Sequence, residues 1–223
     1  MQKAPEKFRF AAVAVDIVVF GIRDNELCVL VDTVHRPPHY DNIPGFPGAM
    51  VLPEENTDEA AARVLRDKAQ LQPIYLEQLY TFSDVDRDAR NRVVSVAYVG
   101  CVRPNQMEQY QHVSAAFVPL RSVKKLAYDH SSMLQIAEQR LAGKLDYTTI
   151  AQFLLATKFT LTELQTVYEI ILRTTFDKRN FRKKILALDI VTETGDMQSG
   201  VQNRPAALYK FTKPTIQKIQ FLG

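Results

Sequence analysis

Apolar positions follow two different periods along the first 150 residues. Several short apolar runs, most of them rich in valine, predict the strands of a sheet. These runs cover residues 11–20, 27–34, 75–82, 92–102 and 115–120. Residues 57–71 and 131–142 instead carry apolar side chains at helical spacing, which predicts two helices. This order of strands and helices predicts an α/β fold, in which a mixed sheet carries helices on its faces.

The segments between these elements are polar. Residues 23–26 are predicted to form the turn of a hairpin between the first two strands. Residues 35–47 are rich in proline and polar side chains, so we expect no regular structure there. This loop holds His35 and His39. No cysteine or third ligand lies beside them, so two solvated histidines are favoured over a metal site.

The last third of the chain has a different pattern. Two helices are predicted at residues 160–173 and 178–188, and a capping box opens the first of them. Two strands, at residues 190–193 and 207–211, then predict a hairpin. A helix, a turn, a second helix and a hairpin in this order indicate a winged helix-turn-helix domain. We therefore expect two domains, at residues 1–150 and 151–223.

The basic charge of the chain lies in this second domain. Residues 160–223 hold ten Lys and Arg against six Asp and Glu, so they carry +4, and the rest of the chain carries −1 of the net +3. A concentrated basic segment is typical of a domain that binds the phosphate backbone of DNA. The predicted DNA-binding residues belong to the second helix and to the hairpin: Lys178, Arg179, Asn180, Arg182, Lys183, Asn203 and Arg204.

Two other interpretations of these basic residues remain open. They could form an ordinary solvated helix face, or they could dock an acidic protein partner. A docking module would bind in a salt-sensitive way without preferring one DNA sequence.

Composition sets further bounds. The apolar fraction of 46% is ample for a packed core. Cys28 and Cys101 each lie inside an apolar run, so we expect buried thiols in a reducing compartment. No run of 18 apolar residues predicts a membrane span, and no signal peptide opens the chain, so a cytoplasmic protein is expected. Asp16 interrupts the first apolar run. We expect either a hydrogen-bonded residue that faces a cleft or a residue with a functional role.

Residues 48–71 carry the outline of a catalytic motif. Ala49, Glu55, Arg63 and Leu71 fit the spacing G-x5-E-x7-R-E-U-x-E-E-x-G-U, where U is a bulky aliphatic residue. This segment resembles the Nudix hydrolase box. The departures are Val64, Asp67, Lys68 and Gln70, which stand at the three glutamates and the second glycine of the motif.

These departures affect metal binding. In Nudix enzymes, clustered carboxylates hold Mg2+, which neutralises the diphosphate and activates water. Val64 cannot bind a metal, and Lys68 puts a positive charge where the cation would sit. The resemblance therefore implies a Nudix fold that has lost, or nearly lost, hydrolysis, with no metal and no cofactor. Two alternatives remain: a simple strand, loop and helix unrelated to Nudix proteins, or an Mg-dependent Nudix hydrolase of nucleoside diphosphate derivatives such as ADP-ribose.

A closer resemblance covers nearly the whole chain. Segments at 75–82, 86–88, 93–98, 126–131 and 143–147 are similar to the NrtR-type Nudix-related transcriptional regulators of bacteria, as are 177–184 and 204–206. This resemblance implies a homodimeric regulator, usually a repressor, that binds palindromic operator DNA. It also implies control of NAD metabolism with ADP-ribose as effector, or of sugar catabolism. The candidate effector-binding residues are Glu55, Arg63, Lys68, Arg87 and Arg92.

Overall fold

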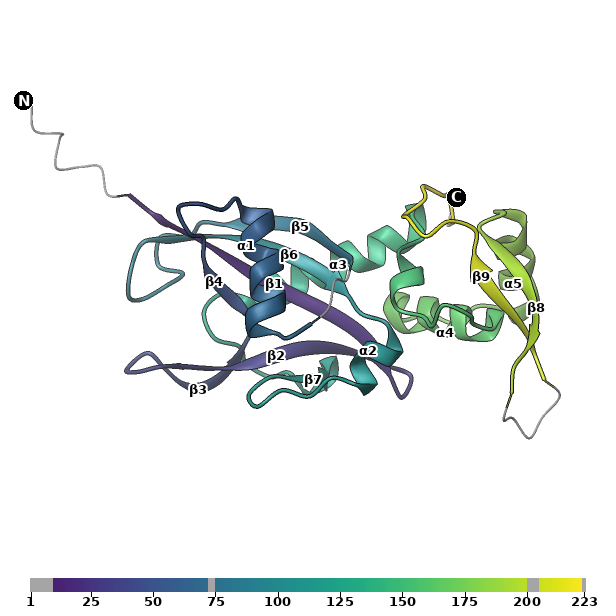
Figure 1. The fold of residues 1–223 in the computed structure, drawn as a ribbon, viewed down its shortest axis with the longest axis horizontal. Helices are drawn as coiled ribbons and strands as arrows, with labels where there is room; N and C mark the ends of the chain where they lie inside the picture. The colour runs from purple at the N-terminus through teal and green to yellow at the C-terminus, as the bar shows by residue number, and fades with distance from the viewer. Residues whose placement is uncertain (1–9, 72–74, 200–204, 222–223) are drawn as a thin grey trace, which may run out of the picture. The chain divides into compact units, whose positions relative to one another are not determined.

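A computed structural model describes residues 10–71, 75–199 and 205–221. A seven-stranded sheet dominates the N-terminal part (Figure 1). Its strand order is β3-β2-β1-β6-β5, and two short strands extend it, since β4 pairs with β1 and β7 with β2. The strands are β1 Ala12–Arg23, β2 Glu26–Arg36, β3 Tyr40–Gly45, β4 Gly48–Met50, β5 Tyr75–Phe82, β6 Val93–Cys101 and β7 Ala116–Pro119. All five predicted strands are confirmed.

The central strand β1 is buried on both faces. Its side chains from Ala14 to Phe20 are all buried, as expected for a continuous apolar run. The strand leads into the predicted hairpin through a two-residue turn. Asp24 and Asn25 both have positive φ, the conformation of a type I′ turn that matches the twist of the two strands.

The predicted loop at residues 35–47 is wrong in part. The strand β2 continues to Arg36, and β3 pairs with it in antiparallel register. Pro44, opposite Thr33, has no amide hydrogen to donate. Because β3 lies at the edge of the strand order, its proline breaks no ladder between two inner strands. The prolines of this segment are therefore compatible with an edge strand, and they do not indicate an irregular loop over its whole length.

The helices follow the predicted order with different ends. Helix α1 covers Thr57–Arg63 and continues as one π-helical turn over Val64–Lys68, so the helix predicted over 57–71 ends early. Asn56 and Glu59 form a capping box at its start. Helix α3 covers His130–Tyr147 and runs past the predicted end at residue 142. Short helical segments not predicted from the sequence are α2 Pro104–Glu108, η2 Leu120–Ser122 and η3 Ile150–Phe153.

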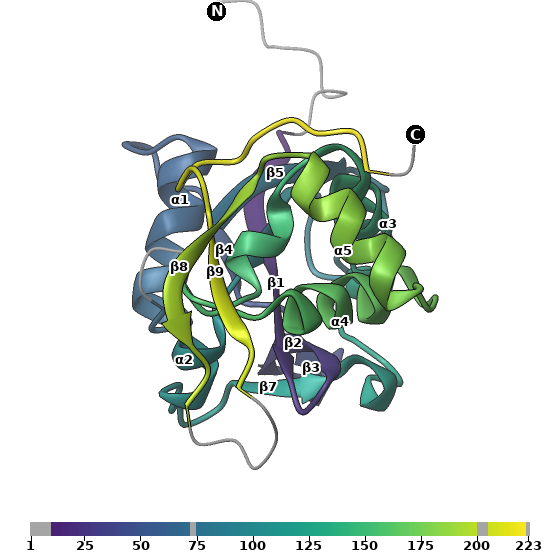
Figure 2. The same ribbon diagram turned by 90° about the vertical axis from the view of Figure 1, so that its right-hand side faces the viewer.

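The C-terminal part has the predicted winged-helix arrangement. Two helices are followed by an antiparallel strand pair, and Figure 2 shows α5 beside α4 and the pair β8–β9. The elements are α4 Leu161–Leu172, α5 Lys178–Ala187, β8 Val191–Met197 and β9 Ala207–Phe211. Thr160 and Glu163 form the expected capping box, and Asp177 caps α5. A cluster of aromatic rings that includes Tyr168, Phe181 and Phe221 forms the core of this region.

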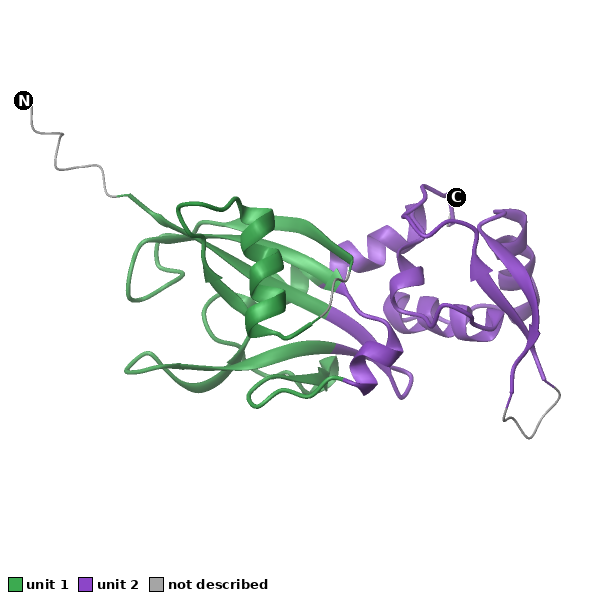
Figure 3. Ribbon diagram, in the orientation of Figure 1, with its two compact units in different colours: residues 1–19, 29–100, 110–137 green, residues 20–28, 101–109, 138–223 purple. Residues whose placement is uncertain are grey.

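The chain divides into two compact units (Figure 3). Unit 1 comprises residues 1–19, 29–100 and 110–137, and unit 2 comprises residues 20–28, 101–109 and 138–223. The division differs from a single cut at residue 150, because two short segments of the sheet region belong to unit 2 and α3 contributes to both units. The predicted domain boundary stays a prediction.

Two further expectations concern cysteine and membranes. Cys28 and Cys101 are buried free thiols, as predicted. Within the described residues, no helix is both long enough and apolar enough to cross a membrane.

Candidate functional site

Unit 1 contains a cavity of about 370 Å³. This volume lies within the range that binds small molecules. Its walls come from β1 and β2, the turn into β4, the end of the π-helical turn, the charged loop at 83–91 and the start of α3. Polar and aromatic side chains both line it, so the cavity offers hydrogen bonds and ring faces to a ligand.

Arg87 forms the charged floor of the cavity. Its guanidinium is almost fully buried and pairs with Asp129, with Nη2 2.7 Å from Oδ1, and with Asp16, with Nη2 3.4 Å from Oδ2. The Ser95 hydroxyl donates a further hydrogen bond to Asp16 at 2.6 Å. Burial alone would raise the pKa of Asp16, but its contacts with His130, Ser95 and Arg87 outweigh burial and hold it below its usual value. Asp16 therefore faces a cleft as an ionised, hydrogen-bonded residue.

His130, the first residue of α3, closes the other side of this floor. Its Nδ1 accepts a hydrogen bond from the Phe46 amide at 2.9 Å, so the ring proton resides on Nε2. Nε2 lies 3.5 Å from Asp16 Oδ1. The Phe46 ring stacks on the imidazole with centroids 5.1 Å apart, and Tyr128 lies at 5.2 Å. Rings thus form one wall of the cavity beside the buried charges.

Asp88, Arg90 and Tyr128 form the rim. Arg90 donates to Asp88 at 2.8 Å, and this hydrogen bond holds the pKa of the Asp88 carboxyl below its usual range. The Arg90 guanidinium carbon lies 5.7 Å from the centre of the Tyr128 ring, within the distance of a cation–π contact. The rim therefore presents a cation and an aromatic ring together.

Lys68 supplies another cation to the cavity. Its Nζ donates to the Gly48 carbonyl oxygen at 2.5 Å. The residue is exposed, but partial desolvation by neighbouring protein atoms, together with the charge of Arg36, lowers the pKa of Lys68. Asp32 and Asp16 act in the opposite direction. Lys68 is thus a cation among the residues that line the cavity, as Asp16 and Asp32 also do.

Three of the five predicted effector-binding residues do not line the cavity. Arg63 pairs with Glu55, with Nη2 2.5 Å from Oε1, and donates to the Met50 carbonyl at 2.9 Å. Glu55 also accepts from the Leu52 amide at 2.8 Å. Both side chains therefore hold the loop before α1. Arg92 donates to the carbonyls of Asp84 and Val93.

The structure brings Lys68 and Arg87 together at the cavity and adds residues that sequence reasoning did not assign to the site. These are Arg36, Arg90, Tyr128 and His130. Arg90 stood in the charged loop at 83–91, and Tyr128 and His130 stood in segment 126–131, which resembles the regulator family. Neither signal placed these residues beside β1, because that position depends on tertiary packing.

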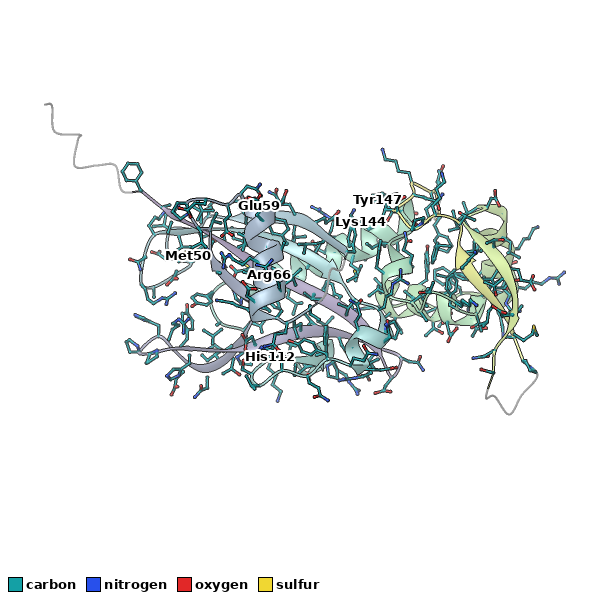
Figure 4. All side chains as sticks on the ribbon, in the orientation of Figure 1. Met50, Glu59, Arg66, His112, Lys144 and Tyr147 are labelled. Carbon is teal, nitrogen blue, oxygen red and sulfur yellow. The ribbon has the colours of Figure 1, made fainter. Side chains whose placement is uncertain are left out.

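The residues at the box positions do not fit a Mg2+ site. Val64 is fully buried and apolar. Asp67 is half-exposed and pairs with Arg66, which Figure 4 labels, at 2.8 Å. No group of three or more His, Cys, Asp or Glu that could hold a metal ion occurs among the described residues. His35 is solvent-exposed and contacts Asp41 at 3.1 Å.

The basic helix α5 in unit 2 is the second candidate site. Lys178, Arg179, Asn180 and Lys183 are exposed along it. Arg182 is partly covered, and its Nη2 lies 3.3 Å from the Thr162 hydroxyl of α4. The exposed side chains thus present three positive charges on one helix. Asn203 and Arg204, predicted at the wing, lie outside the described residues.

Comparison with known proteins links both parts of the chain. A family model described as the NrtR DNA-binding winged helix domain matches residues 151–211. The ADPR responsive transcriptional repressor NtrR of Acinetobacter baylyi is 34% identical over 204 residues, which cover 88% of this chain and 80% of that protein.

Two solved structures are also similar. One is Shewanella oneidensis NrtR complexed with a 27-mer DNA, with 30% identity, a TM-score of 0.79, and coverage of 89% of this chain and 93% of that chain. The other is the NUDIX domain of the same protein complexed with ADP ribose, with 28% identity, a TM-score of 0.53, and coverage of 63% and 94%. These similarities confirm the predicted fold, a Nudix-like α/β domain followed by a winged helix.

Proposed function

The chain belongs to the NrtR family of Nudix-related transcriptional regulators, and we propose that it is a bacterial repressor that binds operator DNA and releases it when ADP-ribose binds. One observation carries this proposal. The 34% identity to an ADPR-responsive repressor spans both the part with the cavity and the part with the exposed basic helix. A chain that keeps both parts can couple a metabolite to DNA.

Helix α5 is the proposed DNA-contacting element. In helix-turn-helix proteins the N-terminal half of the second helix enters the major groove. Lys178, Arg179 and Asn180 lie in that half and are exposed, and Lys183 follows one turn later. Arg182, which also contacts Thr162, and the wing residues Asn203 and Arg204 complete the proposed DNA-binding set. A winged helix of this size gains affinity by dimerising across a palindrome, so we propose a homodimer.

ADP-ribose is the proposed effector because its chemistry fits the cavity. Its adenine ring can stack on aromatic side chains such as Tyr128 and Phe46, and its diphosphate can bind cations such as Lys68 and Arg90. Two relatives support this choice, since one is an ADPR-responsive repressor and the other is a Nudix domain complexed with ADP ribose. A sugar-type metabolite is the alternative effector.

The Nudix-like domain is proposed to bind its ligand without hydrolysing it. Hydrolysis requires carboxylates that hold Mg2+ and activate water. Val64 is apolar and buried, Asp67 pairs with Arg66, and Lys68 is a cation. The Glu55–Arg63 pair is instead used to hold the loop before α1. Membership in a family of repressors agrees with a role that is not catalytic.

Effector and DNA need only favour different arrangements of the protein. A coupling free energy of about 1–3 kcal/mol changes affinity by about 5- to 150-fold. ADP-ribose is proposed to bind the arrangement that cannot span both operator half-sites. Because operator DNA is the partner, we propose the cytoplasm as the location.

The test is binding of the purified full chain to the DNA upstream of its own gene, over a salt series, with and without ADP-ribose. We expect sequence-selective binding that weakens with salt and is relieved by ADP-ribose. Analysis of the nucleotide after incubation with Mg2+ should recover intact ADP-ribose. Absence of DNA selectivity at every salt concentration contradicts the repressor, and accumulation of AMP and ribose phosphate supports a hydrolase instead.

A further inference from the structure

The cavity holds its own cation at the position of a metal-binding carboxylate of the Nudix box. We propose that the Lys68 ammonium replaces the divalent cation of Nudix enzymes, so that this protein binds the diphosphate of its nucleotide effector without metal. The inference rests on the proposed function, since it takes a nucleoside diphosphate as the ligand. It makes Lys68 the residue that decides whether effector binding depends on metal.

The backbone around Lys68 fixes the ammonium in place. Gly48 pairs with Asp16 across the antiparallel strands β4 and β1. A Cβ atom added at Gly48 would lie 2.0 Å from Asp16 Oδ1, so only glycine allows this close approach. The carbonyl of Gly48 then accepts from Lys68 Nζ at 2.5 Å. This hydrogen bond holds the ammonium beside the strand pair β1–β4, at the cavity that Lys68 lines.

The ammonium keeps donors for a ligand. Lysine has three N–H donors, and the Gly48 carbonyl is the one acceptor that the described residues place within hydrogen-bonding distance of Nζ. Asp16 already pairs with Arg87 and accepts a hydrogen bond from Ser95. Asp32 accepts hydrogen bonds from the Ser114 hydroxyl and the Thr33 amide, both at 2.7 Å. The positive charge of Lys68 is therefore available to phosphate oxygens.

The surroundings of Lys68 strengthen its attraction for an anion. The residue is exposed, but neighbouring protein atoms partly desolvate its ammonium and lower its pKa. A desolvated ammonium gains more from a phosphate than a solvated one, because the local dielectric constant is lower. Arg36 lies near enough to contribute to the lowered pKa of Lys68 and also lines the cavity. Two cations on one wall suit a diphosphate, which carries two negative charges.

A divalent cation has no comparable place. A metal ion close to the Lys68 ammonium would meet direct charge repulsion. Two carboxylates that could offset it are occupied or remote, since Asp67 pairs with Arg66 at the exposed surface and Glu55 pairs with Arg63. Val64 offers no oxygen ligand. The residues that replace the glutamates of the box therefore exclude the metal, and one of them, Lys68, supplies a positive charge in its place.

The test is calorimetric titration of the full chain with ADP-ribose, in EDTA and in millimolar Mg2+. The variants are K68Q, which removes the charge, and K68E, which replaces it with a carboxylate. K124Q is the matched control, because Lys124 is an exposed lysine that does not line the cavity. Circular dichroism and operator binding without effector verify that each variant is folded.

The unchanged protein and K124Q should bind ADP-ribose equally in EDTA and in Mg2+, within about twofold. K68Q should bind about 10- to 100-fold more weakly in both conditions, as expected for the loss of a charge-assisted hydrogen bond. K68E should bind ADP-ribose even more weakly than K68Q in EDTA, and its affinity for ADP-ribose should increase when Mg2+ is added.

Three results would overturn the inference. The unchanged protein could lose ADP-ribose binding in EDTA, K68Q could bind as tightly as the unchanged protein, or Mg2+ could fail to restore any affinity to K68E. Failure of the proposed function looks different. In that case the folded, unchanged protein binds no ADP-ribose with or without Mg2+.

Discussion

Arg63 and Arg87 are two arginines of unit 1 that make different contacts. Both were predicted to bind the effector. Arg63 instead clamps the loop before α1 through Glu55 and the Met50 carbonyl, whereas Arg87 is buried between Asp16 and Asp129. A buried guanidinium with two carboxylates holds β1, the charged loop and the start of α3 together. Its contribution to the fold can be measured directly.

Replacing Arg87 with alanine should lower the free energy of unfolding by about 3–5 kcal/mol, because Asp16 then remains buried without its cation. R92A is the matched control. Arg92 is part-buried and donates to the backbone carbonyls of Asp84 and Val93, so its removal should cost no more than about 1 kcal/mol. Urea unfolding followed by circular dichroism compares the two, and equal costs would contradict the structural role of Arg87.

The pair Glu55–Arg63 should give a pH-dependent stability. Its hydrogen bonds lower the pKa of Glu55 from 4.5 to about 2 in the folded protein. Because the folded pKa is the lower one, the pair stabilises the fold above pH 4.5, and this stabilisation is lost as pH falls toward 2. E55Q should therefore lower the Tm modestly at pH 7 and have little effect near pH 2. A Tm difference that does not change with pH would contradict this account.

The sequence predicted those site residues whose chemistry is visible in a motif. Lys68 was identified by its place in the box, and Arg87 by a loop rich in charges. His130 and Tyr128 were not identified as site residues, because their role depends on α3 beginning beside β1. The resemblance of segment 126–131 to the regulator family assigned His130 no role; its importance comes from the contacts of Nδ1 with Phe46 and of Nε2 with Asp16. Such contacts join residues 84 or more positions apart.

At the scale of elements, the C-terminal tail of unit 2 contacts three helices, α3, α4 and α5. The Phe221 amide donates to the Asp146 carbonyl, and the Ile219 amide to the carbonyl of Tyr147, which Figure 4 labels. The Phe221 ring then packs on Tyr168 of α4 and on Phe181 of α5. The tail thus fastens the end of α3 to both winged-helix helices, beyond the residues that the family model matches.

F221A should lower the free energy of unfolding of unit 2 by about 3–5 kcal/mol, since it removes a ring that is 2% exposed. Operator binding should weaken as α5 loses its support. F10A is the control, because Phe10 is 96% exposed and its loss should leave stability unchanged. Urea unfolding and DNA binding of both variants provide the comparison. Native stability in F221A would show that the tail is dispensable.

The exposed basic side chains of α5 predict how the affinity for operator DNA depends on salt concentration. R179A/K183A should weaken operator binding and reduce the slope of log affinity against log salt by about 2, because each basic side chain that binds a phosphate adds close to one to that slope. The control K124A/K125A removes two exposed lysines of unit 1 and should leave the slope unchanged. An equal change in slope for both variants would indicate that the net charge, rather than α5, determines binding.

Element positions were predicted well where local pattern and tertiary packing agree. Strand β5 has the predicted ends, and the capping boxes at Asn56 and Thr160 mark the starts of α1 and α4. The wrong predictions occurred where tertiary packing outweighed the local preference of prolines or glycine. Prolines in 35–47 did not prevent an edge strand, and α3 continues through Gly143, which has open space around it.

At the scale of the whole molecule, helix α3 contributes residues to both units, as the strands β1 and β2 also do. It begins at His130 beside the cavity and ends at Tyr147, where the C-terminal tail binds. Regulation of DNA binding by ADP-ribose requires a free-energy coupling between the cavity and α5, and such a coupling must act in both directions. A metabolite that weakens DNA binding must itself bind more weakly to the DNA complex.

That reciprocity is the most direct test of the account. ADP-ribose should be titrated calorimetrically into the free protein and into the protein–operator complex, and operator affinity should be measured with and without saturating ADP-ribose. We predict that operator DNA weakens ADP-ribose binding by about 5- to 150-fold, and that ADP-ribose weakens operator binding by the same factor. Equal ADP-ribose affinity for the free and DNA-bound protein would contradict the claim that this metabolite controls DNA binding.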